Sequence, residues 1–247
     1  MTPIPVAITV DNMGNAADIG RGHHLQADPA EPGLRVGLPR IARLLSELDL
    51  PATFFVEGWN ALHHGDRIEQ LLAVGHEIAL HGWVHEPWST LDPRRERAIL
   101  AAGKAALDSL GADVSGFRAP GGRRTELTLD LLAELGFSYD SSLGEEHVID
   151  RSGVVIAPFA WSAVDWWWYN VRTPMASPAE WQAGWLDLLD AAARDQRPLV
   201  LIAHARVSAV DPVRADLLEG VLRHVAEHAR FEPMLMRDLA QRLAQQG

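Results

Sequence analysis

Short apolar runs and amphipathic stretches alternate along most of the chain. The apolar runs are rich in β-branched or aromatic residues and bounded by turn residues, which predicts buried strands. We expect strands at Val6–Val10, Ala52–Val56, His76–Leu80, Gly116–Arg118 and Leu199–Ala203. Apolar residues at helical spacing predict helices over Leu38–Leu48, Arg67–Ala73, Pro93–Leu110, Glu126–Leu135, Pro178–Arg194, Pro212–His228 and Met234–Gln245. This alternation predicts an α/β fold, with a parallel sheet covered by helices.

Two segments do not follow the alternation. Asn12–Gly37 is long, rich in Gly, Asp and Pro and poor in apolar residues, which indicates either a functional loop over the strand ends or a flexible insert. Gly144–Gly153 has a similar character. Ligands of parallel α/β sheets bind at the carboxyl ends of the strands, so the residues that directly follow the predicted strands are the candidates for chemistry.

Length, composition and charge restrict the class of protein. The chain has 247 residues, a length that (β/α) barrels use as one unit, so we expect a single domain over residues 1–247. The absence of cysteine excludes disulfides and thiolate chemistry. A net charge of −11 makes nucleic acid an unfavourable partner. Without an apolar span or a basic, cleavable start, we expect a cytoplasmic protein that has no membrane partner.

The most specific chemical signal is the histidine pair in His81-Gly-Trp-Val-His85, which directly follows a predicted strand. Histidines at i and i+4 share one face if the segment is helical, as metal binding requires. Neutral imidazole suits zinc, with cobalt, nickel or iron as alternatives. The competing interpretation, two hydrogen-bonded structural histidines, has about equal weight for an isolated pair.

Polar residues follow two further strands. Asp11 can be a base, a ligand or a turn cap, and Asn12 can offer a carbonyl oxygen to a metal. Arg118 precedes a turn in which Gly121 and Gly122 let backbone N–H groups approach a ligand closely. Taken alone, this segment is typical of an ordinary strand–helix turn.

The last predicted strand ends at His204, whose ordinary pKa suits a general acid but which is equally typical of a structural histidine. Asp165 can hold a histidine protonated or cap a loop. Trp83 and Trp166 are candidates to stack on a ring-shaped substrate, although core packing explains tryptophans at least as well. The apolar run Ala163–Tyr169 could also form a homo-oligomer contact.

Taken in this order, the residues from Asp11 to His204 resemble the polysaccharide deacetylase family, which includes chitin, chitooligosaccharide and peptidoglycan deacetylases. The His-x-x-x-His motif at His81 and the Arg-x-Pro-x-Gly motif at Arg118 carry the resemblance, together with segments between the motifs such as Ala52-Thr-Phe-Phe-Val56. The resemblance covers nearly the whole chain. It implies a distorted (β/α) barrel, which agrees with the strand–helix alternation.

The resemblance also implies a role for each candidate residue. Asp11 would be the general base that activates water at the metal, and Arg118 would orient it. His204 would be the general acid that protonates the leaving amine, and Asp165 would tune its pKa. The metal would be held by Asn12, His81 and His85. Backbone N–H groups near Gly121 and Gly122 would stabilise the oxyanion.

The sequence departs from the family pattern at three positions. The family has two adjacent aspartates, but here the second position is Asn12, so Asp11 could itself become a metal ligand. Gly121 stands where an aromatic residue is common, which opens the pocket floor. Arg206 adds a cation two residues after His204.

We therefore expect a metal-dependent hydrolase that removes an acyl group from the nitrogen of an amino sugar or a small N-acyl compound. Two alternatives stay open. One is a small cyclic ureide or imide amidohydrolase on the same fold, because some relatives act on such compounds. The other is a non-catalytic ligand-binding relative with a degenerate metal site, which only Asn12 supports.

Overall fold

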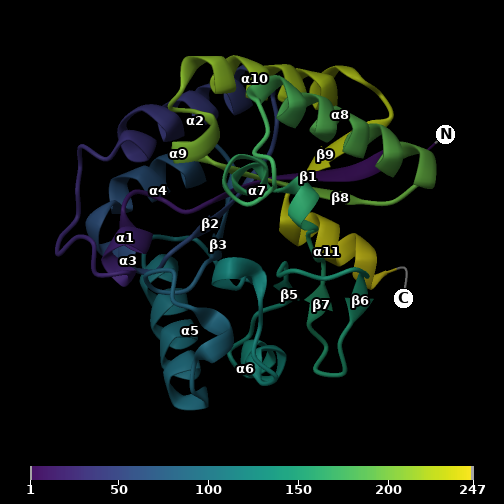
Figure 1. The fold of residues 1–247 in the computed structure, drawn as a ribbon. Coiled ribbons are helices and arrows are strands. Elements are labelled where there is room, and N and C mark those ends of the chain that lie inside the picture. Colours follow the sequence, from purple (N-terminus) through teal and green to yellow (C-terminus); the bar gives the residue numbers. More distant parts are fainter. Residues whose placement is uncertain (1, 246–247) are drawn as a thin grey trace.

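The computed structural model describes residues 2–245 and contains one nine-stranded sheet with helices packed around it (Figure 1). The strand order is β6-β7-β5-β4-β3-β2-β1-β8, and β9 pairs with the first half of β1. All neighbouring strands are parallel except β6 and β7. The strands are β1 (Ile4–Asp11), β2 (Thr53–Val56), β3 (Glu77–Leu80), β4 (Gly116–Phe117), β5 (Tyr139–Asp140), β6 (Val148–Ile149), β7 (Val155–Ile156), β8 (Leu199–His204) and β9 (Phe231–Met234).

Eleven α-helices are found among the described residues. They are α1 (Ala16–Gly20), α2 (Leu38–Glu47), α3 (Trp59–His63), α4 (Gly65–Ala73), α5 (Pro93–Asp108), α6 (Thr128–Glu134), α7 (Asp165–Asn170), α8 (Pro178–Asp195), α9 (Ala205–Ser208), α10 (Pro212–Glu227) and α11 (Met236–Ala244). Capping residues fix several helix starts: Asp92 accepts the N–H groups of Arg94 and Arg95, and Ser177 forms a capping box with Glu180.

The central strands are covered on both faces. Every residue of β2 and β3 is buried, as is typical of a parallel sheet with helices on both sides. Successive residues of β2 point to opposite faces, so Phe54 packs in the larger core cluster and Phe55 in a second cluster with Met236 of α11. Figure 1 shows α8 and α10 on one side of β1 and β8, and α11 on the other.

The sheet curls into a barrel that does not close completely. Within residues 2–245 the two edge strands, β6 and β8, do not pair with each other, but Val164, from the segment after β7, forms a parallel bridge to Ile202 of β8. This architecture confirms the predicted distorted (β/α) barrel. All five predicted strands and all seven predicted helices are present, with ends shifted by a few residues.

Four of the nine strands in the described part of the chain, β5, β6, β7 and β9, were not predicted, and β9 changes the end of the chain. The helix expected from Met234 begins at Met236, because residues 231–234 form β9 instead. On the side of β1 that faces β2, only residues 9–11 pair with β2. The first half of β1 pairs with β9 instead, with Ile4 opposite Phe231.

The irregular segment Asn12–Gly37 contains α1 and a π-helical turn at Gly33–Gly37. No helix among the described residues is long and apolar enough to cross a membrane.

Candidate active site

Polar residues from four strand ends line one cavity, which we call the catalytic cavity; its volume is about 150 Å³. Asp11 ends β1 and His204 ends β8, and the two residues are direct neighbours across the parallel pairing of these strands. His81 follows β3, and Arg118 follows β4. The predicted convergence of these residues at the carboxyl end of the sheet is therefore present in the structure.

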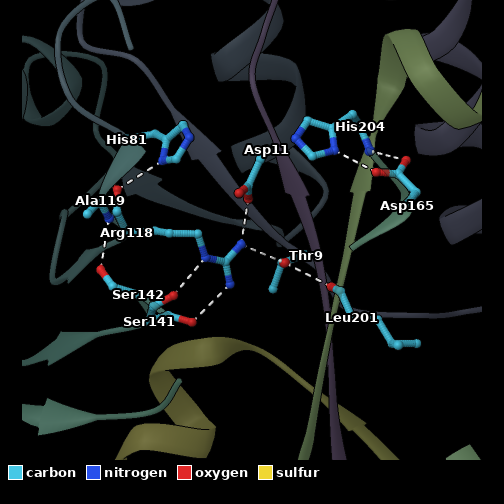
Figure 2. Close-up of polar contacts among 10 residues, drawn as sticks. All are labelled: Thr9, Asp11, His81, Arg118, Ala119, Ser141, Ser142, Asp165, Leu201 and His204. Atoms are coloured by element: carbon cyan, nitrogen blue, oxygen red, sulfur yellow. Dashed lines mark hydrogen bonds and ion pairs between the residues drawn. The ribbon is translucent and has the colours of Figure 1, made fainter. Parts of the chain in front are cut away.

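A buried ion pair fixes the first catalytic candidate. Arg118 donates to Asp11 at 2.5 Å and to Thr9 Oγ1 at 2.9 Å through the same nitrogen (Figure 2). Its other nitrogens donate to the carbonyl and the hydroxyl of Ser141, each at 2.9 Å. The guanidinium also lies 3.8 Å from the centre of the Phe55 ring. These contacts hold the guanidinium in one orientation, so Asp11 has a fixed cationic partner.

A second pair lies beside the first. One oxygen of Asp165 accepts a bond from Nδ1 of His204 at 2.6 Å, and the other accepts the backbone N–H of His204 at 2.7 Å (Figure 2). Ser208 and the backbone N–H of Trp166 also donate to this carboxylate, which is fully buried. Because a carboxylate accepts, Nδ1 of His204 carries a proton and Nε2 is the atom left for proton exchange.

The pKa of His204 follows from two opposing effects. Burial by itself lowers the pKa, because it disfavours the charged imidazolium. The negative charge of Asp165 and its hydrogen bond raise the pKa, and together they outweigh burial, so the pKa of His204 lies above its ordinary 6.5. His204 therefore keeps its proton to a higher pH than a free histidine does.

His81 and His85 are held as neutral imidazoles. Burial, the largest effect, lowers the pKa of each to about 3, and the charge of His81 contributes to the lowering at His85. His81 Nδ1 donates to the carbonyl of Arg118 at 2.9 Å, which leaves a lone pair on Nε2. The ring centres of the two histidines are 5.1 Å apart. Two neutral imidazoles that face one cavity are typical metal ligands.

The spacing of the two histidines at i and i+4 had been interpreted as helical. In the structure a turn brings them together instead. Gly82 and His85 have positive φ angles of 74° and 62°, which a helix does not allow. The carboxylate of Glu86 accepts the backbone N–H groups of Trp83 and Val84 and so fixes the turn. The spacing was informative, but a different backbone geometry produces the pairing.

Asn12 completes a set of three neutral donors. It lines the catalytic cavity, and its Oδ1 atom is buried without a hydrogen-bond partner among the described residues. Its φ of 62° lies in the left-handed region, which Asn tolerates better than most residues. Within residues 2–245, no three His, Cys, Asp or Glu side chains gather as a metal site, so a metal here would depend on this amide oxygen. Asp11 is already engaged by Arg118.

Not every predicted residue lies at the cavity. Trp83 does not line it; this residue is partly buried, and its ring lies beside Gly58 and packs against the core. The N–H of Gly122 donates to the carbonyl of Ala119 and is therefore not free for an oxyanion. Gly121 does line the cavity, with a φ of 71° and open space where a side chain would lie. Trp166 lines it too and is 41% exposed.

Sequence reasoning missed several supporting residues. Thr9, Ser141 and Ser208 position the charged side chains, but serine and threonine are too common for a sequence pattern to single them out. Arg21 lines the cavity from the irregular segment after β1, where no periodicity marks it. A second cavity of about 410 Å³ adjoins the first and is lined partly by this same segment.

The fold and the site define a (β/α)-barrel protein whose reactive groups lie at the carboxyl ends of the strands. Residues 5–139, more than half of the chain, match the family model described as polysaccharide deacetylase. The chain belongs to the polysaccharide deacetylase family.

Curated relatives carry deacetylase names. The chain is 32% identical over 109 residues to a peptidoglycan deacetylase of Helicobacter pylori, a match that covers 44% of this chain and 37% of that protein. It is 38% identical over 94 residues to a chitooligosaccharide deacetylase of Rhizobium leguminosarum bv. phaseoli, covering 37% of this chain and 41% of that protein. The chain thus matches less than half of the length of these relatives.

Solved structures resemble the whole chain. One from Mycobacterium smegmatis, with a provisional polysaccharide deacetylase assignment, is 29% identical, has a TM-score of 0.85 and covers 100% of this chain and 94% of its own. The structure of Puue allantoinase is 20% identical, with a TM-score of 0.80, and covers 96% of this chain and 89% of its own. At this lower identity, the likeness to the allantoinase shows a shared fold only.

Proposed function

We propose that this protein is a metal-dependent hydrolase that cleaves the C–N amide bond of a small N-acyl compound. The observation that carries the proposal is that two ion pairs, one for a proton acceptor and one for a proton donor, lie at one cavity. Asp11 is paired with Arg118 and would accept a proton, and His204 is paired with Asp165 and would donate one. The deacetylase names of the curated relatives support the same bond type.

The donor set beside these pairs fits a divalent metal ion. His81 and His85 are neutral, and the Oδ1 atom of Asn12 has no protein partner among the described residues. Imidazole nitrogen and amide oxygen suit zinc and neighbouring first-row metals. When bound, such an ion would supply a Lewis acid that polarises the amide carbonyl and lowers the pKa of water.

The side chains divide the proton transfers between them. Asp11 takes a proton from the attacking water as its oxygen adds to the carbonyl carbon, while Arg118 keeps the carboxylate in position. His204 gives its Nε2 proton to the nitrogen as the C–N bond breaks, so the amine leaves neutral. Asp165 stabilises the imidazolium until that step. Water is consumed, and a carboxylic acid and an amine are released.

The size of the site favours a small substrate. The catalytic cavity has about 150 Å³, and the adjoining cavity, at about 410 Å³, is within the range of pockets for small molecules. Together they can enclose an acyl group and a compact amine.

Metal analysis tests the proposal first. We would measure metal content by mass spectrometry for the wild type and the His81→Ala/His85→Ala variant, both purified without chelator. Near-stoichiometric zinc or a similar metal that this variant loses is the expected result. The His224→Ala/His228→Ala variant is the matched control, because these histidines are also four residues apart but lie on α10 and just beyond it, outside the cavity.

Turnover completes the test. Wild-type protein should release acetate from small N-acetyl compounds such as N-acetylglucosamine or N-acetylglycine, and the His81→Ala/His85→Ala variant should not. If the wild type takes up no metal even after incubation with divalent ions, the metal-dependent mechanism is wrong. Turnover that is equally fast on long chitin oligomers would contradict a small substrate.

A further inference from the structure

A second cavity, which we call the outer chamber, opens beside the catalytic cavity. Its volume is about 410 Å³. Asn12, Arg21, Trp166 and His204 line both cavities, so the two spaces are contiguous. The walls of the outer chamber come from the segment after β1, from α7 and from the segment that follows β8.

Three arginines and two carboxylates line the outer chamber. Arg206 lies 2.9 Å from Asp18 and 3.6 Å from Glu31, so its charge is compensated. Arg21 lies 3.7 Å from the same Asp18 carboxylate. The carboxylates of Asp18 and Glu31 therefore compensate the charges of two arginines, and Asp18 pairs with both of them.

The third arginine of the chamber is Arg214, near the start of α10. Within residues 2–245 no carboxylate lies within ion-pair distance of its guanidinium. The group lies 4.0 Å from the centre of the Tyr169 ring and donates one bond to the carbonyl of Val207 at 3.1 Å. A guanidinium has several N–H donors, so this single bond leaves donors for a ligand. The chamber holds three guanidinium groups against two carboxylates, although the chain as a whole carries −11.

The position of His204 decides which half of a substrate would occupy this space. A general acid must contact the leaving nitrogen, and His204 lies between the two cavities. His81 and His85 line only the catalytic cavity, so the carbonyl end points there. The amine half then extends past His204 into the outer chamber, toward Arg214.

We propose that the outer chamber is a subsite for an anionic group, and that the substrate is an amide whose amine half carries a carboxylate, as in an N-acyl amino acid. This inference rests on the proposed hydrolase function. Arg214 binds the carboxylate, and the apolar Leu38 and Trp166 flank the carbon skeleton. Hydrolysis adds water across the C–N bond and releases the acyl group as an acid and the amine half as an amino acid.

Binding of an uncleavable probe tests the subsite separately from catalysis. In 4-oxopentanoate a CH₂ group replaces the N–H of N-acetylglycine, so no amide bond is present, and its methyl ester is the neutral counterpart. We would measure the affinity of both for the purified protein by ligand-observed NMR. The acid should bind at least about tenfold more tightly than the ester, or about 1.4 kcal/mol.

Two variants isolate the charge of Arg214. Arg214→Met keeps a long apolar side chain over Tyr169 and should reduce the preference for the acid to about twofold or less. Arg214→Lys, which restores the charge, should recover part of it. Arg223→Met is the control on the same helix, since Arg223 pairs with Glu219 and Glu227 outside the chamber, and it should leave the preference unchanged. Melting temperatures would show that each variant is folded.

The outcomes separate the two proposals. If the wild type binds acid and ester equally, or binds neither, the anionic subsite is wrong, even if neutral N-acetyl compounds are hydrolysed. If the acid is preferred through Arg214 but neither N-acetylglycine nor N-acetylglycinamide is cleaved, the subsite stands and the hydrolase proposal fails. If both hold, N-acetylglycine should have a lower KM than N-acetylglycinamide, and Arg214→Met should abolish the difference.

Discussion

Asp165 binds His204 twice, once through the ring Nδ1 at 2.6 Å and once through the backbone N–H at 2.7 Å. The carboxylate thus fixes both the position of the residue and the tautomer of its ring. The two residues are 39 positions apart in the sequence, and the bridge between Val164 and Ile202 brings their segments together. The protonation of His204 therefore depends on a contact that only the folded barrel provides.

The Asp165→Asn variant should lose activity on the alkaline side of its pH profile. Burial lowers the pKa of His204, and Asp165 raises it, so the pKa in the variant should be lower than in the wild type. A smaller fraction of His204 would then carry the proton for the leaving amine at neutral pH, and kcat/KM there should drop, by roughly 10²-fold if the general acid is lost. The measurement is the pH dependence of kcat/KM. Asp190→Asn, which removes a surface carboxylate paired with Arg230, is the control. An unchanged alkaline limb would show that His204 is not the general acid.

Asn12→Asp should increase metal affinity by at least about tenfold. In the proposed metal site the substitution replaces a neutral oxygen donor by a charged one, and Asp also tolerates the left-handed backbone there. Zinc affinity can be measured by competition with a chromophoric chelator. Asn170→Asp adds the same charge in the outer chamber and should have a smaller effect. Equal effects of the two substitutions would argue against Asn12 as a ligand.

Arg118→Met should be destabilising, by about 3–5 kcal/mol, because it leaves the buried Asp11 carboxylate without its cation. The double variant Asp11→Asn/Arg118→Met should recover part of this loss, since it buries no unpaired charge. Urea unfolding of the wild type, both single variants and the double variant gives the coupling energy between the two residues. A coupling energy near zero would contradict a tight ion pair at this position.

Glu57 should make the stability of the protein pH-dependent. Burial, the largest effect, raises the pKa of this carboxyl from 4.5 to about 8, and the charges of Asp11 and Glu86 add to the rise. Between pH 4.5 and 8 the folded state keeps a proton that the unfolded state releases, so the free energy of unfolding should fall as the pH rises through this range. The contribution is on the order of 5 kcal/mol.

The Glu57→Gln variant should lose most of that pH dependence, because Gln can still accept from the N–H of Met13 but has no proton to release. Urea unfolding at pH 5, 7 and 9 measures it. Glu69→Gln, at an exposed position of α4, is the control and should behave as the wild type does. Parallel profiles for the wild type and Glu57→Gln would mean that Glu57 ionises normally.

The sequence by itself determined the family and, within residues 2–245, five of the nine strands and seven of the eleven helices. Short β-rich runs and capped amphipathic segments are local signals, so Val6–Val10 and Pro93–Leu110 could be recognised without knowledge of their partners. The motifs around His81 and Arg118 were equally local, and each lies at a strand end as expected. The short strands β5, β6, β7 and β9 were missed, and the strand character of β9 comes from pairing with β1 and not from its own residues.

Only the tertiary structure decided how the candidates are used. The burial that holds His81 and His85 neutral and the contact with Asp165 that raises the pKa of His204 depend on neighbours distant in the sequence. Trp83 and Trp166 looked equivalent in the sequence, yet Trp83 packs against the core and Trp166 lines the cavity. The uncompensated charge of Arg214 is also a property of the fold, because pairing depends on distances between side chains and not on the composition of the chain.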